Sequence, residues 1–435
     1  MQMRQTIHFP LPSDFSIEDF LLNAGKFSPV VLLNSNQSAQ ATSDPYGKFK
    51  LIAAVGSLEE IISQENSFSS LQNFQDKKDW YFGYFTFDLK NQLENLSSSN
   101  PDSIGFPALH FFRPRWVLIF HDDYIHVEFD QKNDSEEATI EHIKQLTQKY
   151  TEKKITPPPV LNAKVSKEEY ISNVVKIQKH IQRGDIYEMN YCVEFFSENS
   201  DISPAHVYNE LNQVSPMPFS CYYQLDDHYL MCASPERFLA KRGNKIISQP
   251  IKGTSKRGQN EEDDKQIIEE LRNNPKEQSE NVMIVDLVRN DLSRTAAKGS
   301  VKVEELFGIY TFLQLHQMIS TVSSELGSGF AGHDALSAAF PMGSMTGAPK
   351  IRAMQLIEEF ESTKRGLYSG AVGYFDPDGD FDFNVVIRSI QYNRKNKYLN
   401  FMVGSAITIS SDPEIEYTEC LLKAKGMMKA LRQSL

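Results

Sequence analysis

The sequence predicts an α+β fold whose strands are mainly antiparallel. Strand-like runs dominate the first part of the chain, and helices and further strands then follow in blocks. The chain has 435 residues, which is enough for two or three average domains or for one large two-sheet domain. Hydrophobic residues make up 40% and charged residues 23%, so the composition is that of an ordinary globular protein.

The first 155 residues are expected to form a strand-rich N-terminal subdomain, residues 1–155. Four apolar or β-favouring runs are bounded there by turn-forming residues. These runs are residues 30–33, 50–55, 80–85 and 116–120. Residues 135–153 have the spacing of a helix and end in charged residues.

A proline-rich connector separates this part from the rest of the chain. Residues 157–159 are three prolines, which favour a stiff polyproline segment, and we expect residues 156–165 to join two subdomains. An amphipathic helix is then predicted to begin after Ser166, which forms a capping box with Glu169. Further strands and two long helices follow, so residues 166–435 form the second region.

Charge and hydropathy exclude several classes of protein. The net charge of −12 and the pI near 5.4 argue against nucleic-acid binding, which uses basic surfaces. No run of about 18 apolar residues predicts a membrane span, and the N-terminus has no apolar signal segment. Four scattered cysteines suit a reducing compartment. We therefore expect a soluble cytoplasmic enzyme.

A single lysine is the most informative residue of the second region. Lys252 lies between Pro250, which fixes a backbone angle, and Gly253, which permits a tight turn, and apolar Ile251 precedes it. A lysine held in this way can lose its solvation, lower its pKa and act as a neutral amine nucleophile. The alternative is an ordinary solvated loop lysine, so the motif gains weight only from its surroundings.

Two helix starts carry paired glutamates. Asn274-Pro275 and Asp412-Pro413 each combine a capping residue with a proline at the first helical position. Each helix then places two glutamates, three residues apart, on one face. They are Glu277 and Glu280 on the first helix, and Glu416 and Glu419 on the second. Such carboxylates either surround a hard cation such as Mg²⁺ or are solvated residues that favour the helix dipoles.

The succession of motifs in the second region resembles the chorismate-utilising enzymes, the family of anthranilate synthase component I and its relatives. The resemblance runs from about residue 166 to 426. Its motifs are residues 234–238 (Ser-Pro-Glu-Arg-Phe), 249–254 (around Lys252), 280–292, 345–350 (Met-Thr-Gly-Ala-Pro-Lys) and 370–374 (Gly-Ala-Val-Gly-Tyr). The resemblance implies a sandwich of two large, mainly antiparallel sheets with helices outside, in which the two halves of the chain interleave around one site.

Within this family, a lysine in the Pro-Ile-Lys-Gly-Thr motif is the mark of aminodeoxychorismate synthases, whereas anthranilate synthases carry a small residue there. The resemblance therefore implies component I of such a synthase, which makes 4-amino-4-deoxychorismate from chorismate and ammonia for p-aminobenzoate and folate synthesis. Lys252 would add to C2 of the ring and Glu236 would protonate the departing hydroxyl before ammonia attacks C4. A proton donor near pH 7 must be buried; the alternative for Glu236 is a salt bridge with Arg237.

The resemblance also assigns the ligands of substrate and metal. Glu280 and Glu419 would bind Mg²⁺ directly and Glu277 and Glu416 through water, and the ion would chelate the ring carboxylate of chorismate. The remaining contacts are implied as follows: Tyr374 and Arg388 for a carboxylate, the backbone of Gly404, Ser405 and Ala406 for a carboxylate, and Thr346 and Gly347 near the leaving group. Ser405 and Ala406 depart from the glycine-rich pattern of the family.

Three further positions depart from the family pattern. The family has a histidine three residues before a serine, and the matching position in this sequence is Gln317; His316 stands one place earlier. In a strand, a shift of one residue sends the side chain to the opposite face. Gln317 is slightly favoured, and His316 could reach in through a bulge. Glu188 aligns with the water-activating lysine of isochorismate synthases, so water attack is disfavoured. Asn34 replaces the acidic residue of a tryptophan-binding stretch, so feedback by tryptophan is disfavoured.

Two alternative functions stay open. Anthranilate synthase component I is disfavoured by Lys252 and Asn34. A non-catalytic subunit that binds chorismate or a partner is disfavoured by the intact Lys252, Glu236 and four glutamates. No cysteine has the context of a glutaminase nucleophile, so ammonia is expected from a partner glutamine amidotransferase subunit or from solution, and neither nucleic acid nor membrane is an expected partner.

Overall fold

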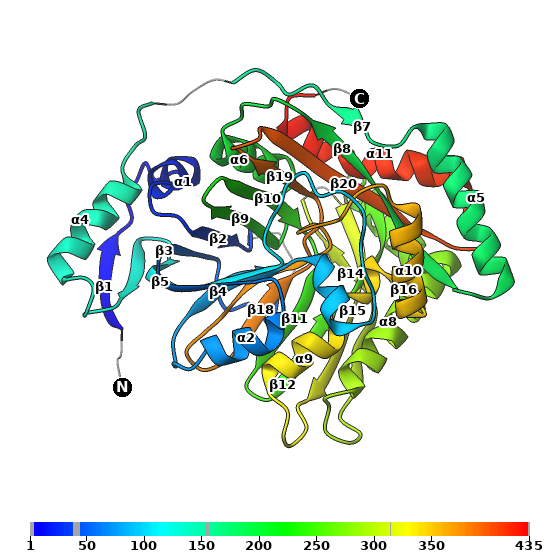
Figure 1. Cartoon of the computed structure of the whole chain (residues 1–435), viewed down its shortest axis with the longest axis horizontal. Coiled ribbons are helices and arrows are strands. Elements are labelled where there is room, and N and C mark those ends of the chain that lie inside the picture. The colour runs from blue at the N-terminus through cyan, green and yellow to red at the C-terminus, as the bar shows by residue number, and fades with distance from the viewer. Residues whose placement is uncertain (1–3, 38–43, 153–155, 314, 434–435) are drawn as a thin grey trace.

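The computed structural model describes residues 4–37, 44–152, 156–313 and 315–433, which form the expected α+β fold (Figure 1). Every strand pairing among these residues is antiparallel. The strands connect into one hydrogen-bonded network with two arms.

The first arm consists of neighbouring strands from both halves of the chain. In order across the arm they are β8 (Glu188–Ser197), β20 (Tyr398–Ile407), β19 (Ser389–Asn393), β10 (His228–Ser234), β9 (Phe219–Leu225), β2 (Val30–Asn34) and β3 (Leu51–Ser63). Short strands at its far edge are β7 (Asn162–Ala163) and β16 (Gly347–Ala348), which both pair with β8.

The second arm carries most of the motif residues. Its strands, in order, are β4 (Tyr81–Phe85), β17 (Ala371–Phe375), β18 (Phe381–Asn384), β11 (Arg237–Arg242), β12 (Lys245–Gln249), β15 (Leu315–Glu325) and β14 (Lys302–Thr311), with β13 (Ile251–Lys256) also on β15. Because β2 pairs with β9 and β4 pairs with β17, strands from before the proline-rich connector are inserted among strands from after it.

Two long strands make the arms continuous. β3 pairs with β5 (Leu109–Phe120) along most of its length. The first part of β5 also pairs with β4, and its last part pairs with β6 (Tyr124–Phe129). β6 in turn pairs with β1 (Gln5–Pro10). The sequence pattern predicted shorter strands at 50–55 and 116–120, because charged residues such as Glu59 and Arg113 interrupt the apolar runs. The two expected sheets are therefore joined through β3 and β5.

Helices cover the outer faces of the arms (Figure 1). The helices are α1 (Ile17–Ala24), α2 (Ser67–Phe74), α3 (Lys90–Leu93), α4 (Glu136–Thr147), α5 (Lys167–Arg183), α6 (Pro204–Val214), α7 (Glu261–Arg272), α8 (Pro275–Ser293), α9 (Gly332–Ala339), α10 (Lys350–Phe360) and α11 (Pro413–Ala430). α5, α6 and α11 pack on the first arm, and α7 and α8 pack on the second. The predicted cap at Ser166 is confirmed, since its hydroxyl accepts the Glu169 N–H.

The arms face one another across an apolar core. Val31, Ile52 and Tyr223 of the first arm belong to the same buried cluster as Phe82 and Val372 of the second. Burial of this much apolar surface from both halves of the chain makes the arms one folding unit. No helix in the described part of the chain is long and apolar enough to cross a membrane.

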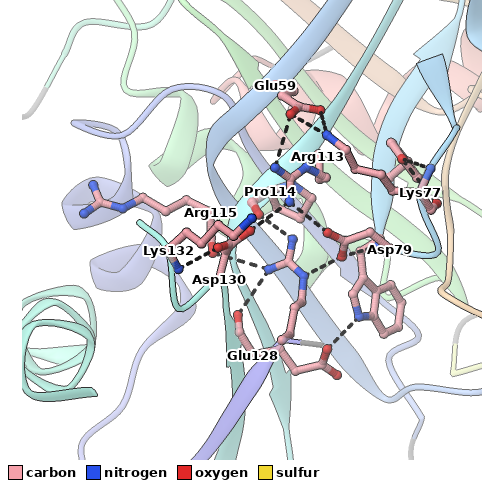
Figure 2. Close-up of polar contacts among 12 residues, drawn as sticks. Glu59, Lys77, Asp79, Arg113, Pro114, Arg115, Glu128, Asp130 and Lys132 are labelled. Atoms are coloured by element: carbon pink, nitrogen blue, oxygen red, sulfur yellow. Dashed lines mark hydrogen bonds and ion pairs between the residues drawn. The ribbon is translucent and has the colours of Figure 1, made fainter. Parts of the chain in front are cut away.

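A charged cluster lies near the N-terminus, and we call it the Arg113 cluster: Arg4, Glu59, Asp79, Arg113 and Asp130. Figure 2 labels the last four of these residues. Arg113 Nη1 lies 3.1 Å from both Asp79 Oδ2 and Asp130 Oδ2, and Nη2 lies 3.4 Å from Glu59 Oε1. Arg4 Nε donates to Asp79 Oδ1 at 2.5 Å. These contacts connect the residue before β1 to β3, to β5 and to the residues just before β4 and just after β6, so the cluster joins neighbouring strands at this side of the sheet.

Candidate active site

Lys252 lies inside the protein on β13. Only 10% of its side chain is exposed, and its Nζ donates to Glu188 Oε1 at 2.6 Å. The pairing of β13 with β15 is irregular between Ile251 and Thr254, and Gly253 has a φ of +92°. A Cβ at Gly253 would lie 3.1 Å from Glu277 Oε2, so glycine is needed at this turn of the strand.

The expected lowering of the Lys252 pKa is wrong for this arrangement. Burial lowers the pKa of Lys252, but the carboxylates of Glu188, Glu280 and Glu236 together hold it above its ordinary value. The amine is therefore charged until a neighbouring group accepts its proton. The sequence correctly predicted that Lys252 is buried. It did not show that three carboxylates surround the ammonium, and these determine the direction of the pKa shift.

Glu188 is a site residue that sequence reasoning did not include. It is the first residue of β8, is 1% exposed, and its Oε1 holds Lys252. Its other oxygen, Oε2, is buried and has no hydrogen-bond partner within the described ranges. The available signal was its alignment with a base of related enzymes, but the pairing with Lys252 joins positions 64 residues apart and follows no sequence rule.

Glu236 has the surroundings of a proton donor. It is 4% exposed, and burial raises its pKa to about 7, against the opposing effects of Ser344 and Lys252. Glu236 and Ser344 both line a pocket of about 330 Å³ between β11, α8 and the segment before β16. The alternative of a salt bridge with Arg237 is wrong, because Arg237 pairs with Asp44 and Asp382.

The four glutamates gather at the beginnings of α8 and α11, whose predicted caps are confirmed. Asn274 accepts the N–H groups of Lys276 and Glu277, and Asp412 caps α11 in the same way. Burial lowers the pKa of Lys276, but the charges of the four glutamates together raise it, so all four act on one ammonium. The four are Glu277, Glu280, Glu416 and Glu419.

Each glutamate has its own setting. Burial, with further contributions from Glu188 and Glu277, raises the pKa of Glu280 to about 7. Glu419 Oε1 lies 2.6 Å from Lys423 Nζ, and this neighbour outweighs burial and lowers the pKa of Glu419. The donor type suits Mg²⁺. Within the described residues, however, no three His, Cys, Asp or Glu side chains form a group that could hold a metal ion, so we derive no chemical step through one.

Arg388 offers a partly buried positive charge. No hydrogen bond or ion pair joins its guanidinium to another residue in the described part of the chain, and burial lowers its pKa, opposed by Tyr368 and Glu419. Its φ of +51° is unusual for a residue other than glycine. An unpaired, partly buried guanidinium is suited to receive a carboxylate, because arginine can bind both oxygens.

Tyr374 is not the partner of Arg388. It lines a separate pocket of about 510 Å³ that also contains Asn34 and Phe49, and its ring packs against Phe49 and Trp80. Tyr368 is the tyrosine that acts electrostatically on Arg388. The expected pair is corrected to Tyr368 and Arg388; the sequence suggested the wrong tyrosine because both flank the same glycine-rich motif.

Thr346 and Gly347 lie beside Glu188. Gly347 pairs with Met189 across β16 and β8, and a Cβ on Gly347, whose φ is +149°, would overlap the Glu188 carbonyl oxygen at 2.2 Å. The Thr346 hydroxyl donates to the Met342 carbonyl at 3.2 Å. The structure therefore brings this motif to the same end of β8 that carries the Lys252 contact.

The segment 404–406 lies on β20, directly beside β8. Gly404 opposes Cys192, and a Cβ there would lie 2.5 Å from its sulfur. The Ser405 hydroxyl is 3.0 Å from Tyr170 Oη, so that side chain is used in the core. Ala406 opposes Asn190. Any contact of this segment with substrate therefore belongs to the backbone, as expected, and stays a prediction.

His316 and Gln317 occupy different settings on β15. His316 lies between Thr311 and Asp264, with Nδ1 2.9 Å from Thr311 Oγ1 and Nε2 3.0 Å from Asp264 Oδ1. Gln317 pairs with Thr254, two residues from Lys252, and its Oε1 is buried without a partner among the residues that the structure describes. Gln317 is thus the residue with free hydrogen-bonding capacity, and its role stays a prediction.

The site therefore combines a buried lysine, a carboxyl whose pKa is raised to about 7 and, in the described part of the chain, an unpaired guanidinium. Such a set can bind a small carboxylic acid, form a bond from the amine to an electrophilic carbon and protonate a leaving oxygen.

Comparisons with known proteins agree with this chemistry. The chain is 32% identical to aminodeoxychorismate synthase component 1 of Bacillus subtilis, over 83% of this chain and 78% of that protein. It is 34% identical to anthranilate synthase component 1 of Lactococcus lactis, over 85% and 86% of the two chains. The crystal structure of anthranilate synthase component I from Streptococcus pneumoniae superposes with a TM-score of 0.76 at 26% identity, covering 90% of this chain and 95% of that one.

A family profile adds the range of the match. Residues 28–429 match the family described as chorismate binding enzyme, so the match includes β2, β4 and every candidate site residue. This chain belongs to the chorismate binding enzyme family.

Proposed function

We propose that the chain is component I of an aminodeoxychorismate synthase and converts chorismate and ammonia to 4-amino-4-deoxychorismate. The relatives include both aminodeoxychorismate and anthranilate synthases at similar identity, so family membership does not separate the two. The observation that carries the proposal is the buried Lys252 amine close to Glu236, whose pKa is raised to about 7.

The proposed reaction uses these two groups in sequence. The neutral Lys252 amine attacks C2 of the ring, the double bonds shift, and the C4–O bond breaks as Glu236 gives its proton to the hydroxyl, which leaves as water. Ammonia then attacks C4, the double bonds return and the C2–N bond breaks. Glu236, now a carboxylate, accepts the proton that the new C4 ammonium releases.

Arg388 is proposed to bind a substrate carboxylate, with Tyr368 beside it. A guanidinium bound to that carboxylate would fix the ring in one orientation and so bring C2 to the Lys252 amine, which is the positioning that lowers the barrier for a two-molecule step. Gln317, Thr346 and the backbone at 404–406 complete the proposed substrate contacts.

Mg²⁺ is part of the proposal. Glu280 and Glu419 would bind it, with Glu277 and Glu416 behind them, and a bound Mg²⁺ supplies a positive charge for the ring carboxylate. The support is the charge on these helix starts: four glutamates act on Lys276, and burial, with the charges of Glu188 and Glu277, raises the pKa of Glu280.

Ammonia is proposed to come from a separate glutamine amidotransferase subunit. Glutamine hydrolysis needs an activated thiolate, and all four cysteines are buried. Burial raises the pKa of the Cys232 and Cys420 thiols, which is the opposite of activation.

The test is to identify the product. The purified chain is incubated with chorismate, Mg²⁺ and an ammonium salt, and the product is identified by mass and fluorescence. We expect 4-amino-4-deoxychorismate without pyruvate release. Anthranilate with pyruvate would instead establish anthranilate synthase, which the similar identity to those relatives keeps as the second candidate.

A further inference from the structure

We propose that Glu188 is the proton acceptor that turns Lys252 into a nucleophile and returns the proton when the lysine leaves. The inference rests on the proposed function of Lys252 and adds a residue to it. It begins from two observations: the Glu188–Lys252 contact of 2.6 Å, and the second Glu188 oxygen, which is buried without a partner in the described part of the chain.

The need for an acceptor follows from the charge state of Lys252. An ammonium has no lone pair and cannot attack carbon. Three carboxylates act on it, those of Glu188, Glu280 and Glu236, and they favour the charged form. The lysine must therefore lose a proton to a group within hydrogen-bond reach at the moment of attack.

Glu188 is the carboxylate in position to accept it. Among the described residues, it is the one whose side chain hydrogen-bonds to Lys252 Nζ. Glu236 has to hold its own proton for the leaving hydroxyl, so it cannot serve as the acceptor in the same step. Glu280 acts on Lys252 only through its charge and lies 3.8 Å from Lys276.

The fold holds this acceptor in place. Glu188 begins β8, whose next residue, Met189, is fixed between Gly347 on one side and Ile407 on the other. With one oxygen on Lys252 and the other unsatisfied, the carboxylate can take a proton on Oε1 without a change of backbone. An unsatisfied buried oxygen is more unfavourable on a charged carboxylate than on a neutral carboxyl, so protonation on Oε1 reduces that disadvantage.

The proton balance closes over one turnover. Glu188 takes one proton from the Lys252 ammonium as the C2–N bond forms. When ammonia has attacked C4 and the C2–N bond breaks, the departing amine takes that proton back. Glu236 gives one proton to the hydroxyl, which leaves as water, and regains one from the new C4 ammonium. Both residues end as they began, and no further reactant is needed.

The test compares Glu188→Gln, Glu188→Asp and a matched control, Glu194→Gln. Glu194 lies on the same strand, is 3% exposed and also has one unpartnered oxygen, but its Oε1 accepts from Asn400 at 2.6 Å and it is remote from Lys252. Each variant is assayed with chorismate, Mg²⁺ and ammonium across a pH series at a constant concentration of free NH₃.

We expect Glu188→Gln to lower kcat about a hundredfold or more, with little change in KM for chorismate. Without the acceptor, the lysine proton must leave to solvent, so kcat should rise with pH by about tenfold per unit below about pH 7, where Glu236 keeps its proton, and should level off above it. Glu188→Asp should recover part of the rate, and Glu194→Gln should keep the wild-type profile. An unchanged or faster Glu188→Gln enzyme with a wild-type pH profile would overturn the proposal.

A second measurement separates this inference from the function on which it rests. In the absence of ammonia, wild-type protein mixed with chorismate should gain the mass of chorismate less one water on Lys252, and Glu188→Gln should gain it far more slowly. Equal rates of adduct formation overturn the role of Glu188 and leave the lysine mechanism intact. If wild-type protein makes no aminodeoxychorismate, or Lys252→Ala is fully active, the proposed function itself fails. Should Glu188→Gln not fold, Glu188→Asp decides by the same pH profile.

Discussion

Two charge clusters in this molecule differ in their balance of charge. In the Arg113 cluster, two arginines face three carboxylates, and Lys77 pairs with one of these, Glu59, so that three positive charges meet three negative ones. The pKa of Asp130 is lowered there despite its burial. Around Lys252, one ammonium faces three carboxylates, and the pKa values of Glu236 and Glu280 are raised to about 7. The first cluster is neutralised by the protein itself, and the second keeps an excess of acid.

The difference shows what each cluster can do. A cluster whose carboxylates stay ionised by contact with guanidinium groups stabilises one conformation and has no proton to exchange near neutral pH. A cluster whose carboxyls titrate near pH 7 can give and take protons, and its surplus of negative charge favours a bound cation. The balance of charge thus separates a structural cluster from a reactive one, although both are buried.

The largest effect should come from removing the amine. Lys252→Ala should lower the formation of 4-amino-4-deoxychorismate by about a thousandfold or more, since no nearby group replaces the nucleophile. Lys48→Ala is the control, because Lys48 also contacts two carboxylates, those of Asp376 and Asp380, but away from the site. Turnover of the Lys252→Ala protein at the wild-type rate, measured by product formation, would contradict the assignment.

The opposite outcome is expected in the structural cluster. Arg113→Met should reduce the free energy of unfolding by about 3–5 kcal/mol, because it removes the guanidinium that pairs with buried Asp130 and one of the two that pair with Asp79. At a temperature where the variant is folded, kcat should stay within about twofold of the wild type. Denaturant titration and the ammonia assay measure the two quantities.

A matched variant on the exposed edge of that cluster sharpens this prediction. Lys77 pairs with Glu59 at 2.6 Å, with both side chains more than 40% exposed. Lys77→Met should therefore cost less than about 1 kcal/mol. Equal losses of unfolding free energy in Lys77→Met and Arg113→Met would mean that burial does not make the Arg113 ion pairs more important for stability than the exposed Lys77–Glu59 pair.

The pH dependence of stability should have opposite signs in the two clusters. Folded Glu236 keeps its proton to about pH 7, whereas the unfolded chain loses it near 4.5. Its contribution to the free energy of unfolding should therefore fall by about 3 kcal/mol between these pH values. Asp130, whose pKa is lowered, contributes stability above its unfolded pKa that is lost as the pH falls.

Glu236→Gln is the variant that tests this sign. It should remove the decline of stability toward pH 7, and it should lower kcat because the proton donor is lost. The wild-type rate, at constant free NH₃, should fall above about pH 7, where Glu236 loses its proton. A wild-type decline in stability that persists in Glu236→Gln would assign it to another group.

A smaller effect is expected at the proposed metal ligands. Glu280→Gln removes one anionic donor and should raise the Mg²⁺ concentration for half-maximal activity about tenfold. Glu270→Gln, on the exposed face of α7, is the control. Full activity of chelator-treated wild-type protein without added Mg²⁺ would rule out the metal requirement.

No effect at all is expected from thiol chemistry. The chain should use ammonium salts but not glutamine, and alkylation of the folded protein should leave the ammonia-dependent rate unchanged, because all four cysteines are buried. Addition of a separate glutaminase subunit should confer use of glutamine. Glutamate release from glutamine by the chain alone, abolished by alkylation, would show that it contains its own glutaminase site.

The sequence determined the features that depend on local spacing. The caps and prolines before Glu277 and Glu416 fix where α8 and α11 begin, and the three-residue spacing then puts each glutamate pair on one face. Local sequence patterns of a few residues also predicted the strand runs and the α+β class. The motifs that contain Lys252 and Glu236 were recognised in the same way.

Only the tertiary structure decided how distant segments meet. The contact of Glu188 with Lys252, the position of Tyr368 in place of Tyr374 near Arg388, and the direction of the Lys252 pKa all depend on strands brought together from separate parts of the chain. Periodicity fixes the face of a strand, but it does not fix which strand lies opposite. A pKa depends on every charge within several ångströms, and most of those charges are far away in the sequence.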